Sequence, residues 1–239
     1  VAHDIEALFD PNTTQPLPSE VSTRAVLDFS STGAHPLAYD AARRRVVMLR
    51  AQVGATVSLH EWSGTLWLPL TATGAPVQRI DPAAVYDRIR AQLVVFGGLT
   101  GIGDPGVTYG YSAAGWSVLA GSGVAHPPST MGSTAVYVDR ADPGHMLVLD
   151  GLVLSGTQPG GLWKWDGAAW TLLDQGAGAH PEKRYRASMA YDAAQNKVVL
   201  VGGVGAETSD YLTCKTWAWN GTVWASTNPP AELLPRYGA

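Results

Sequence analysis

Apolar and polar positions along this chain repeat a pattern that is typical of β-hairpins. In the clearest copy, MAYDAAQNKVVLVGG at residues 189–203, an apolar run ends in Tyr-Asp, a polar stretch reverses the chain, and a β-branched run ends in two glycines. Short apolar runs bounded by turn residues favour strands. The run VVLV at residues 198–201 predicts a strand buried on both faces. Gly202 and Gly203 supply the backbone freedom with which the chain leaves that strand.

The hairpin occurs three more times. The related segments are LAYDAARRRVVML at residues 37–49, AVYDRIRAQLVVFGG at residues 84–98 and AVYVDRADPGHMLVLDG at residues 135–151. The four copies share a tyrosine, at Tyr39, Tyr86, Tyr137 and Tyr191. An interval of about fifty residues, made of strands, indicates a propeller-type repeat rather than a helical solenoid.

Each copy is followed by a second hairpin that is rich in aromatic residues. The clearest are LWKWDGAAWTLL at residues 162–173 and TWAWNGTVWAST at residues 216–227. Their Asp-Gly and Asn-Gly pairs are strong hairpin-turn signals, because these residues tolerate positive φ. The sequence therefore predicts an all-β fold whose blades each have an inner and an outer hairpin. The residues predicted to be structural repeat positions are the four shared tyrosines with Gly97, Gly98, Gly202, Gly203, Trp165, Trp170, Trp219 and Trp224.

These features together resemble the kelch repeat, in bacterial-type versions. The resemblance covers residues 36–227 and implies a β-propeller of four-stranded blades at residues 36–73, 83–122, 134–176 and 188–227. We expect one domain over residues 1–239, with a fifth blade formed or completed by residues 1–30 and 229–239, because closure removes exposed strand edges. The rival interpretation is a segment of a six- or seven-bladed ring. The double glycine is replaced by Arg50-Ala51 in the first copy and by Asp150-Gly151 in the third.

The composition agrees with many short strands and excludes several functions. The chain has 27 glycines and 16 prolines, yet 46% of its residues are hydrophobic. A net charge of −4 offers no basic field for nucleic acid. No apolar run is long enough to cross a membrane, so we expect no membrane insertion. The start at Val1 is interpreted as part of a longer protein, with an extracellular or cell-surface location favoured and the compartment otherwise open.

Most residues with chemical potential repeat from blade to blade, which favours a structural role. His35, His126 and His180 share an Ala-His-Pro context that could gather imidazoles on one rim, but positions one blade apart are too far apart to share a metal. The shared tyrosines and the aspartates after most of them could do acid-base work. Since each blade has them, we expect the tyrosines to pack between blades and the aspartates to cap turns. Arg79 and Arg184 are expected to bind carbonyl groups of a neighbouring blade.

Two functional alternatives compete with this structural interpretation: an oxidase-like enzyme and a sugar-binding propeller. The resemblance extends to galactose-oxidase-like propellers, whose copper-radical site requires a cysteine joined to a tyrosine and two histidine ligands. Cys214 has Tyr211 nearby, but no histidine follows His180 and no segment matches the ligand motif. We therefore expect no cofactor, no metal, no catalytic residue and no enzyme. Tryptophans on the outer hairpins could stack on sugar rings, although their alternation favours packing.

The sequence predicts a non-catalytic interaction module that presents loops to a protein partner. Loops on one face of a rigid scaffold usually carry function, and those after the second strand of each blade vary most. The predicted partner-binding residues in these loops and next to them are Asp104, Tyr109, Tyr111, Glu207, Asp210 and Tyr211. The alternative function is a carbohydrate-binding, lectin-like propeller, and an oxidase-like enzyme comes third.

Overall fold

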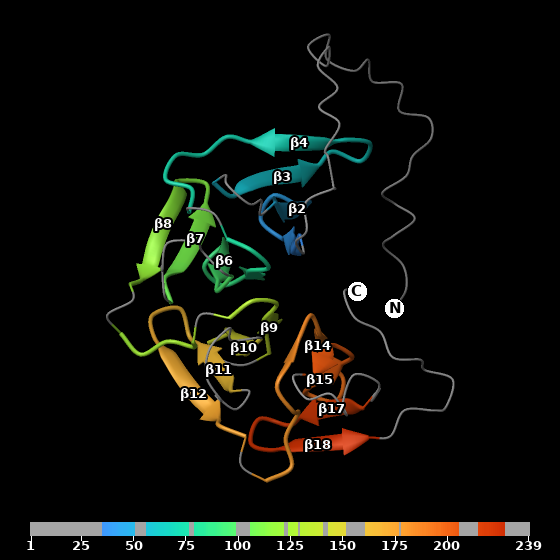
Figure 1. The fold of residues 1–239 in the computed structure, drawn as a ribbon. Coiled ribbons are helices and arrows are strands. Elements are labelled where there is room, and N and C mark those ends of the chain that lie inside the picture. The colour runs from blue at the N-terminus through green and yellow to red at the C-terminus, as the bar shows by residue number, and fades with distance from the viewer. Residues whose placement is uncertain are drawn as a thin grey trace.

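The predicted all-β propeller is confirmed by a computed structural model, whose strands form four antiparallel four-stranded sheets around a common axis (Figure 1). The structure describes residues 35–50, 56–76, 79–98, 106–121, 124–128, 130–140, 143–151, 161–176, 178–205 and 215–227. The predicted closing blade at residues 1–30 and 229–239 lies outside these residues. Within them, no helix has the length and apolar character to cross a membrane.

The first two blades each run from the axis outward in sequence order. Blade 1 has β1, β2, β3 and β4 at Leu37–Asp40, Arg45–Arg50, Ser58–Trp62 and Trp67–Leu70. Blade 2 has β5, β6, β7 and β8 at Ala83–Asp87, Gln92–Phe96, Thr108–Ser112 and Gly115–Ala120.

The last two blades follow the same order. Blade 3 has β9, β10, β11 and β12 at Thr134–Val138, His145–Leu149, Leu162–Trp165 and Trp170–Asp174. Blade 4 has β14, β15, β17 and β18 at Ser188–Asp192, Lys197–Val201, Thr216–Trp219 and Trp224–Thr227. A two-residue pair, β13 at Arg184–Tyr185 and β16 at Val204–Gly205, flanks blade 4. The outer strands β4, β8, β12 and β18 lie at the periphery of Figure 1, so β1, β5, β9 and β14 surround the axis.

An aspartate begins the turn of the inner hairpin in blades 1, 2 and 4. Asp40 accepts a hydrogen bond from the Arg43 backbone N–H, Asp87 from those of Ile89 and Arg90, and Asp192 from those of Ala194 and Gln195. Such Asx turns satisfy backbone donors that the reversal leaves without strand partners. The tyrosine-aspartate ending of these strands therefore specifies where the chain reverses.

The double glycines leave the buried strands with a left-handed backbone. Gly97 and Gly98 have φ of 73° and 81°, and Gly202 and Gly203 have φ of 70° and 88°. A residue with a Cβ resists this conformation, which explains the glycine pair. Neither Asp150 nor Gly151, at the same place in blade 3, is among the positive-φ residues of the described chain. The chain therefore leaves the second strand of blade 3 without the left-handed backbone seen in blades 2 and 4.

The hydrophobic core consists of three clusters, each between two consecutive blades. Val94 and Phe96 of blade 2 share one cluster with Met146, Val148 and Trp165 of blade 3. The other two clusters join blade 1 to blade 2 and blade 3 to blade 4. Blades 2 and 3 each have a neighbouring blade on both faces. After its first residue, the second strand of each is therefore a continuous apolar run, as the sequence predicts.

Seven of the nine tryptophans, all but Trp62 and Trp67, belong to these clusters. Trp165, Trp170, Trp217, Trp219 and Trp224 are all at most 5% exposed. Trp62, Trp67, Trp116 and Trp163 are half-buried. Residues two apart share a face of a strand, and Trp217 and Trp219 indeed lie in one cluster. The tryptophans are therefore not the exposed platforms that sugar stacking requires.

One of the shared tyrosines joins its blade to the preceding one by a hydrogen bond. The Tyr137 hydroxyl donates to Asp87 Oδ1 at 2.8 Å. Burial and the Asp40 carboxylate of blade 1 raise the pKa of Tyr86 to about 12, and the Tyr86 hydroxyl has no hydrogen-bond partner among the described residues. Tyr191 instead donates to Asn196 of its own hairpin at 2.7 Å, and Tyr39 is 51% exposed. Among the described residues, a shared tyrosine thus makes an inter-blade hydrogen bond between blades 2 and 3.

We expect Tyr137→Phe to lower the free energy of unfolding by about 1–3 kcal/mol, because it removes a hydroxyl donor from a buried carboxylate. Tyr39→Phe is the matched control, with an expected change within about 0.5 kcal/mol since that side chain is exposed. Urea denaturation followed by tryptophan fluorescence measures both. Equal losses in the two variants would contradict a specific role for the bond to Asp87.

Candidate functional site at the propeller axis

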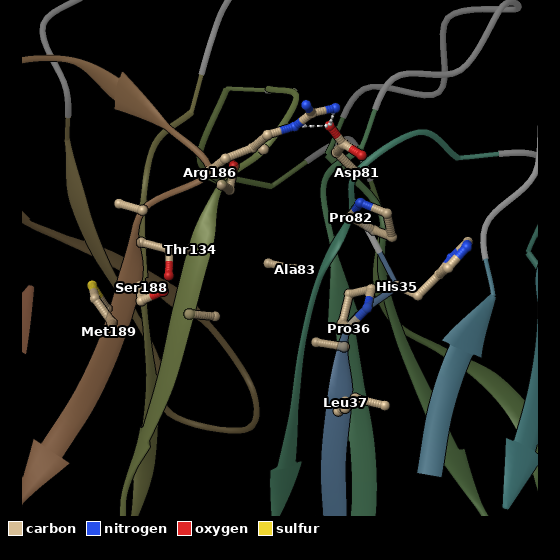
Figure 2. A pocket seen from close by; sticks show the side chains of 15 residues that line it. His35, Pro36, Leu37, Asp81, Pro82, Ala83, Thr134, Arg186, Ser188 and Met189 are labelled. Atoms are coloured by element: carbon tan, nitrogen blue, oxygen red, sulfur yellow. Dashed lines mark hydrogen bonds and ion pairs between the residues drawn. The ribbon is translucent and has the colours of Figure 1, made fainter. Parts of the chain in front are cut away.

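A pocket of about 350 Å³ opens on the axis, where the innermost strands begin. All four blades contribute to it. Its wall includes Leu37 of β1, Ala83 of β5, Thr134 of β9 and Met189 of β14. Figure 2 shows β9 and β14 on one side, β1 and β5 on the other, and the open space between them. The volume lies within the range of roughly 300–1,000 Å³ that is usual for small-molecule sites.

An ion pair spans the mouth of this pocket (Figure 2). Asp81 precedes β5 and Arg186 precedes β14, so the pair joins blade 2 to blade 4. Arg186 donates to Asp81 Oδ2 from Nε at 3.0 Å and from Nη2 at 2.8 Å. The Asp81 side chain is fully buried, whereas that of Arg186 is 33% exposed. Asp81 therefore holds the guanidinium, and the guanidinium faces the pocket.

The backbone at the mouth is also linked from blade to blade. The Gly132 N–H donates to the Asp81 carbonyl at 3.1 Å, and the Arg186 N–H donates to the Gly132 carbonyl at 2.8 Å. These three residues stand five positions before the repeat tyrosines of blades 2, 3 and 4. They have φ of 51°, 68° and 55°. A left-handed residue thus precedes the first strand of each of these blades, and those of blades 3 and 4 bind their predecessor.

Two non-glycine residues with a left-handed backbone lie at this mouth. The described non-glycine residues with positive φ are Arg44, Asp81, Ala91, Arg186 and Asn196. Arg44, Ala91 and Asn196 end equivalent turns of the inner hairpins, which leaves Asp81 and Arg186 as the two that form the ion pair. Left-handed non-glycine residues cost about 1–2 kcal/mol each and cluster at functional sites. The conformation therefore favours a ligand site here.

Buried polar groups support the pocket wall from behind. Arg79 Nη1 donates to the Gly97 carbonyl at 2.6 Å, and Arg184 Nη1 to the Gly202 carbonyl at 2.9 Å. Both carbonyl groups belong to the blade that the arginine precedes, because the chain that leads into the first strand runs beside the exit from the second. A bond of these arginines to a neighbouring blade stays a prediction.

Blade 3 replaces this arrangement with a carboxylate. Thr130 and Asp150 occupy the positions of the arginine and the first glycine. Asp150 Oδ2 accepts from the Gly161 N–H at 3.0 Å, while Oδ1 has no hydrogen-bond partner among the described residues. Burial raises the pKa of Asp150 to about 7. Near neutral pH, this carboxyl group is thus only partly ionised.

The two described residues among those predicted to bind a partner, Tyr109 and Tyr111, do not line the axial pocket. Tyr109 and Tyr111 lie on one face of β7 and pack on the cluster between blades 1 and 2. Arg79 lies over the Tyr109 ring at 4.9 Å and Arg43 over the Tyr111 ring at 5.9 Å. The other predicted residues, Asp104, Glu207, Asp210 and Tyr211, lie outside the described residues. Asp81 and Arg186 are functional candidates that sequence reasoning missed.

In two of the Ala-His-Pro segments the histidine ring lies against the carbonyl group of the following proline. His126 Nδ1 lies 2.6 Å from the Pro127 carbonyl oxygen, and His180 Nδ1 lies 2.8 Å from that of Pro181. Burial lowers the pKa of His35 in the third such segment. Three or more potential metal ligands do not come together anywhere in the described part of the chain.

Comparisons with solved structures agree with this architecture. The SapL1 lectin, in complex with α-methyl fucoside, matches with a TM-score of 0.53 and 18% identity, over 84% of this chain and 70% of the lectin. An exo-β-1,3-galactanase from Phanerochaete chrysosporium, with galactose, matches with a TM-score of 0.56 and 9% identity, over 83% of this chain and 50% of the enzyme. A putative exo-β-1,3-galactanase from Bifidobacterium bifidum matches with a TM-score of 0.52 and 10% identity, over 83% and 72%.

Fold and comparisons together define the class. The chain is a β-propeller with an axial pocket, and it spans half the length of the Phanerochaete galactanase. At these identities the matches show the fold. No protein-family model and no curated protein matches the sequence, so the kelch identity of the repeats stays a prediction.

We expect the contribution of Asp150 to the stability of the protein to fall as pH rises from about 4 to about 7. In that window the unfolded Asp150 has lost its proton while the folded Asp150 retains it, so the unfolded state binds fewer protons. Asp150→Asn removes this titration and keeps an oxygen for the Gly161 N–H. The stability advantage of the variant should therefore grow by a few kcal/mol across the window, at about 1.4 kcal/mol for each pKa unit. Urea denaturation at pH 4 to 8 measures it, and a difference that does not change with pH would count against the assignment.

Proposed function

We propose that this propeller binds a neutral carbohydrate in the axial pocket. The observation that carries the proposal is the geometry of Arg186. Asp81 fixes its Nε and Nη2, while Nη1 makes no protein hydrogen bond among the described residues. Two N–H donors of one rigid, half-exposed guanidinium are therefore available to ligand oxygens. Adjacent hydroxyl groups of a sugar ring match such a planar, forked donor.

Charge favours a neutral polyhydroxylated ligand over an anion. The buried Asp81 carboxylate lies 2.8 Å from Arg186 and compensates its charge, so the mouth offers hydrogen bonds without a net positive field. The side chains of Ser133, Thr134 and Ser188 add hydroxyl groups to the lining. Hydroxyl groups both donate and accept, as those of a sugar do. A few placed polar groups in an otherwise apolar wall are typical of small-molecule sites.

Relatives in fold support a carbohydrate over the protein partner that the variable loops predicted. The SapL1 lectin was solved with α-methyl fucoside and the Phanerochaete galactanase with galactose. A fucose-specific lectin from Aleuria aurantia also matches, with a TM-score of 0.50 and 14% identity over 79% of this chain and 58% of the lectin. Four of the six residues predicted for a protein partner lie outside the described part of the chain, so no geometry supports that function.

The proposal is binding without bond cleavage. Glycoside hydrolysis generally uses two carboxyl groups on either side of the scissile bond, about 5–10 Å apart. Among the described residues that line the pocket, Asp81 is the one carboxylate, and it is buried and paired. We expect no release of nitrophenol when the protein is incubated with 4-nitrophenyl fucosides and galactosides. Enzyme-dependent release that Asp81→Asn abolishes would contradict a purely binding role.

We expect Arg186→Lys to weaken carbohydrate binding at least tenfold while the melting temperature stays within a few degrees. Lysine keeps a cation beside the buried Asp81 but loses the planar fork. Glycan arrays identify the ligand, and isothermal titration calorimetry with methyl α-L-fucoside and methyl β-D-galactoside compares the variants. Arg45→Lys is the matched control, since Arg45 is exposed on β2.

Two results would overturn the proposal. One is the absence of binding to any glycan by the wild-type protein. The other is equal affinity of wild type and Arg186→Lys for the glycan that binds, which would place the site elsewhere on the propeller.

A further inference from the structure

The axial pocket continues inward along the axis. A second cavity of about 330 Å³ lies toward the turns of the inner hairpins, lined by Tyr39, Val85, Val136 and Tyr137 among others. Leu37, Ala84 and Ala135 line both cavities. The two cavities therefore adjoin along this shared wall, and we name them together the axial channel, with the Arg186 mouth at one end and the tyrosines at the other.

The chemistry changes with depth. At the mouth, Arg186 and hydroxyl side chains line the axial pocket. Deeper, where the two cavities adjoin, the lining residues are the shared Leu37, Ala84 and Ala135, together with Met189 of the axial pocket. Gly132 at the mouth and Ala135 are three residues apart, which is roughly 10 Å along a strand. The edges of the innermost strands also meet the channel, but the side chains that flank them at this depth are apolar.

Residue size keeps the channel open at this level. Leu37, Ala84, Ala135 and Met189 occupy the same repeat position, two residues before the shared tyrosine. Two of the four are alanines, so blades 2 and 3 leave space that larger side chains would fill. Leu37 is 58% exposed and lines this space. Burying such apolar surface in a ligand contact is favourable by about 25 cal/mol per Å².

We propose that the ligand is a glycoside with an apolar aglycone, whose sugar binds at Arg186 and whose aglycone extends past Leu37 and Ala135. This inference rests on the proposed function and specifies its ligand class. A free sugar would fill only the mouth, and the apolar level beneath would keep its exposed surface. An unbranched chain attached to the anomeric oxygen reaches that level without passing another polar side chain.

The test compares methyl and hexyl glycosides of the same sugar, using α-L-fucosides and β-D-galactosides, by isothermal titration calorimetry. We expect the hexyl form to bind at least tenfold more tightly than the methyl form. Ala135→Leu fills the channel, and Leu37→Ser makes its wall polar, so each should reduce the ratio of hexyl to methyl glycoside affinity below threefold. Ala114→Leu, in the exposed turn between β7 and β8, is the control for an added side chain.

The outcomes separate the inference from the function beneath it. Equal affinity for methyl and hexyl forms overturns the aglycone inference and leaves carbohydrate binding standing. A hexyl preference that survives Ala135→Leu and Leu37→Ser also overturns it, because the chain then contacts another surface. If neither form binds, both the function and the inference are wrong.

Discussion

The buried aspartate at the turn of an inner hairpin is the interaction on which the arrangement of blades depends. Asp87 caps its own turn through the Ile89 and Arg90 N–H groups, and it accepts the hydroxyl of Tyr137 from the next blade. The same carboxylate therefore shapes one blade and positions another. Since the apolar clusters between blades are not directional, such polar bonds determine how far one blade is rotated and shifted against its neighbour.

Much of the fold could be predicted because each blade repeats the same short sequence signals. Tyrosine-aspartate at a strand end, a β-branched run and an Asp-Gly or Asn-Gly turn are local signals, and their physical causes are local. The outer turns differ in detail: at Asp166 and Gly167 the loop takes four residues, with the Asp166 carboxylate accepting from Ala168 and Ala169, and glycine alone has positive φ. The turn was predictable from sequence, whereas its length was not.

The axial site was harder to predict, because its residues become neighbours only when the ring forms. Asp81 and Arg186 lie 105 positions apart and stand in linkers that resemble each other little. A usable signal did exist, since both precede the repeat tyrosine by five residues, as Gly132 does. The tryptophans favoured a different site, because their number suggested aromatic surfaces for sugar stacking. In the structure, all nine are buried or half-buried. Composition alone could not distinguish packing from binding.

At the mouth, the backbone of each linking residue holds the blades together, while recognition of a ligand depends on the side chain. Asp81, Gly132 and Arg186 hold one another through main-chain N–H and carbonyl groups, and these atoms are present whatever the side chain is. An acid, no side chain at all and a base are accepted at the three equivalent positions. Exchange or duplication of a blade could therefore change the chemistry of the axial pocket while the chain of links around it is preserved. Such a ring can acquire a new specificity one blade at a time.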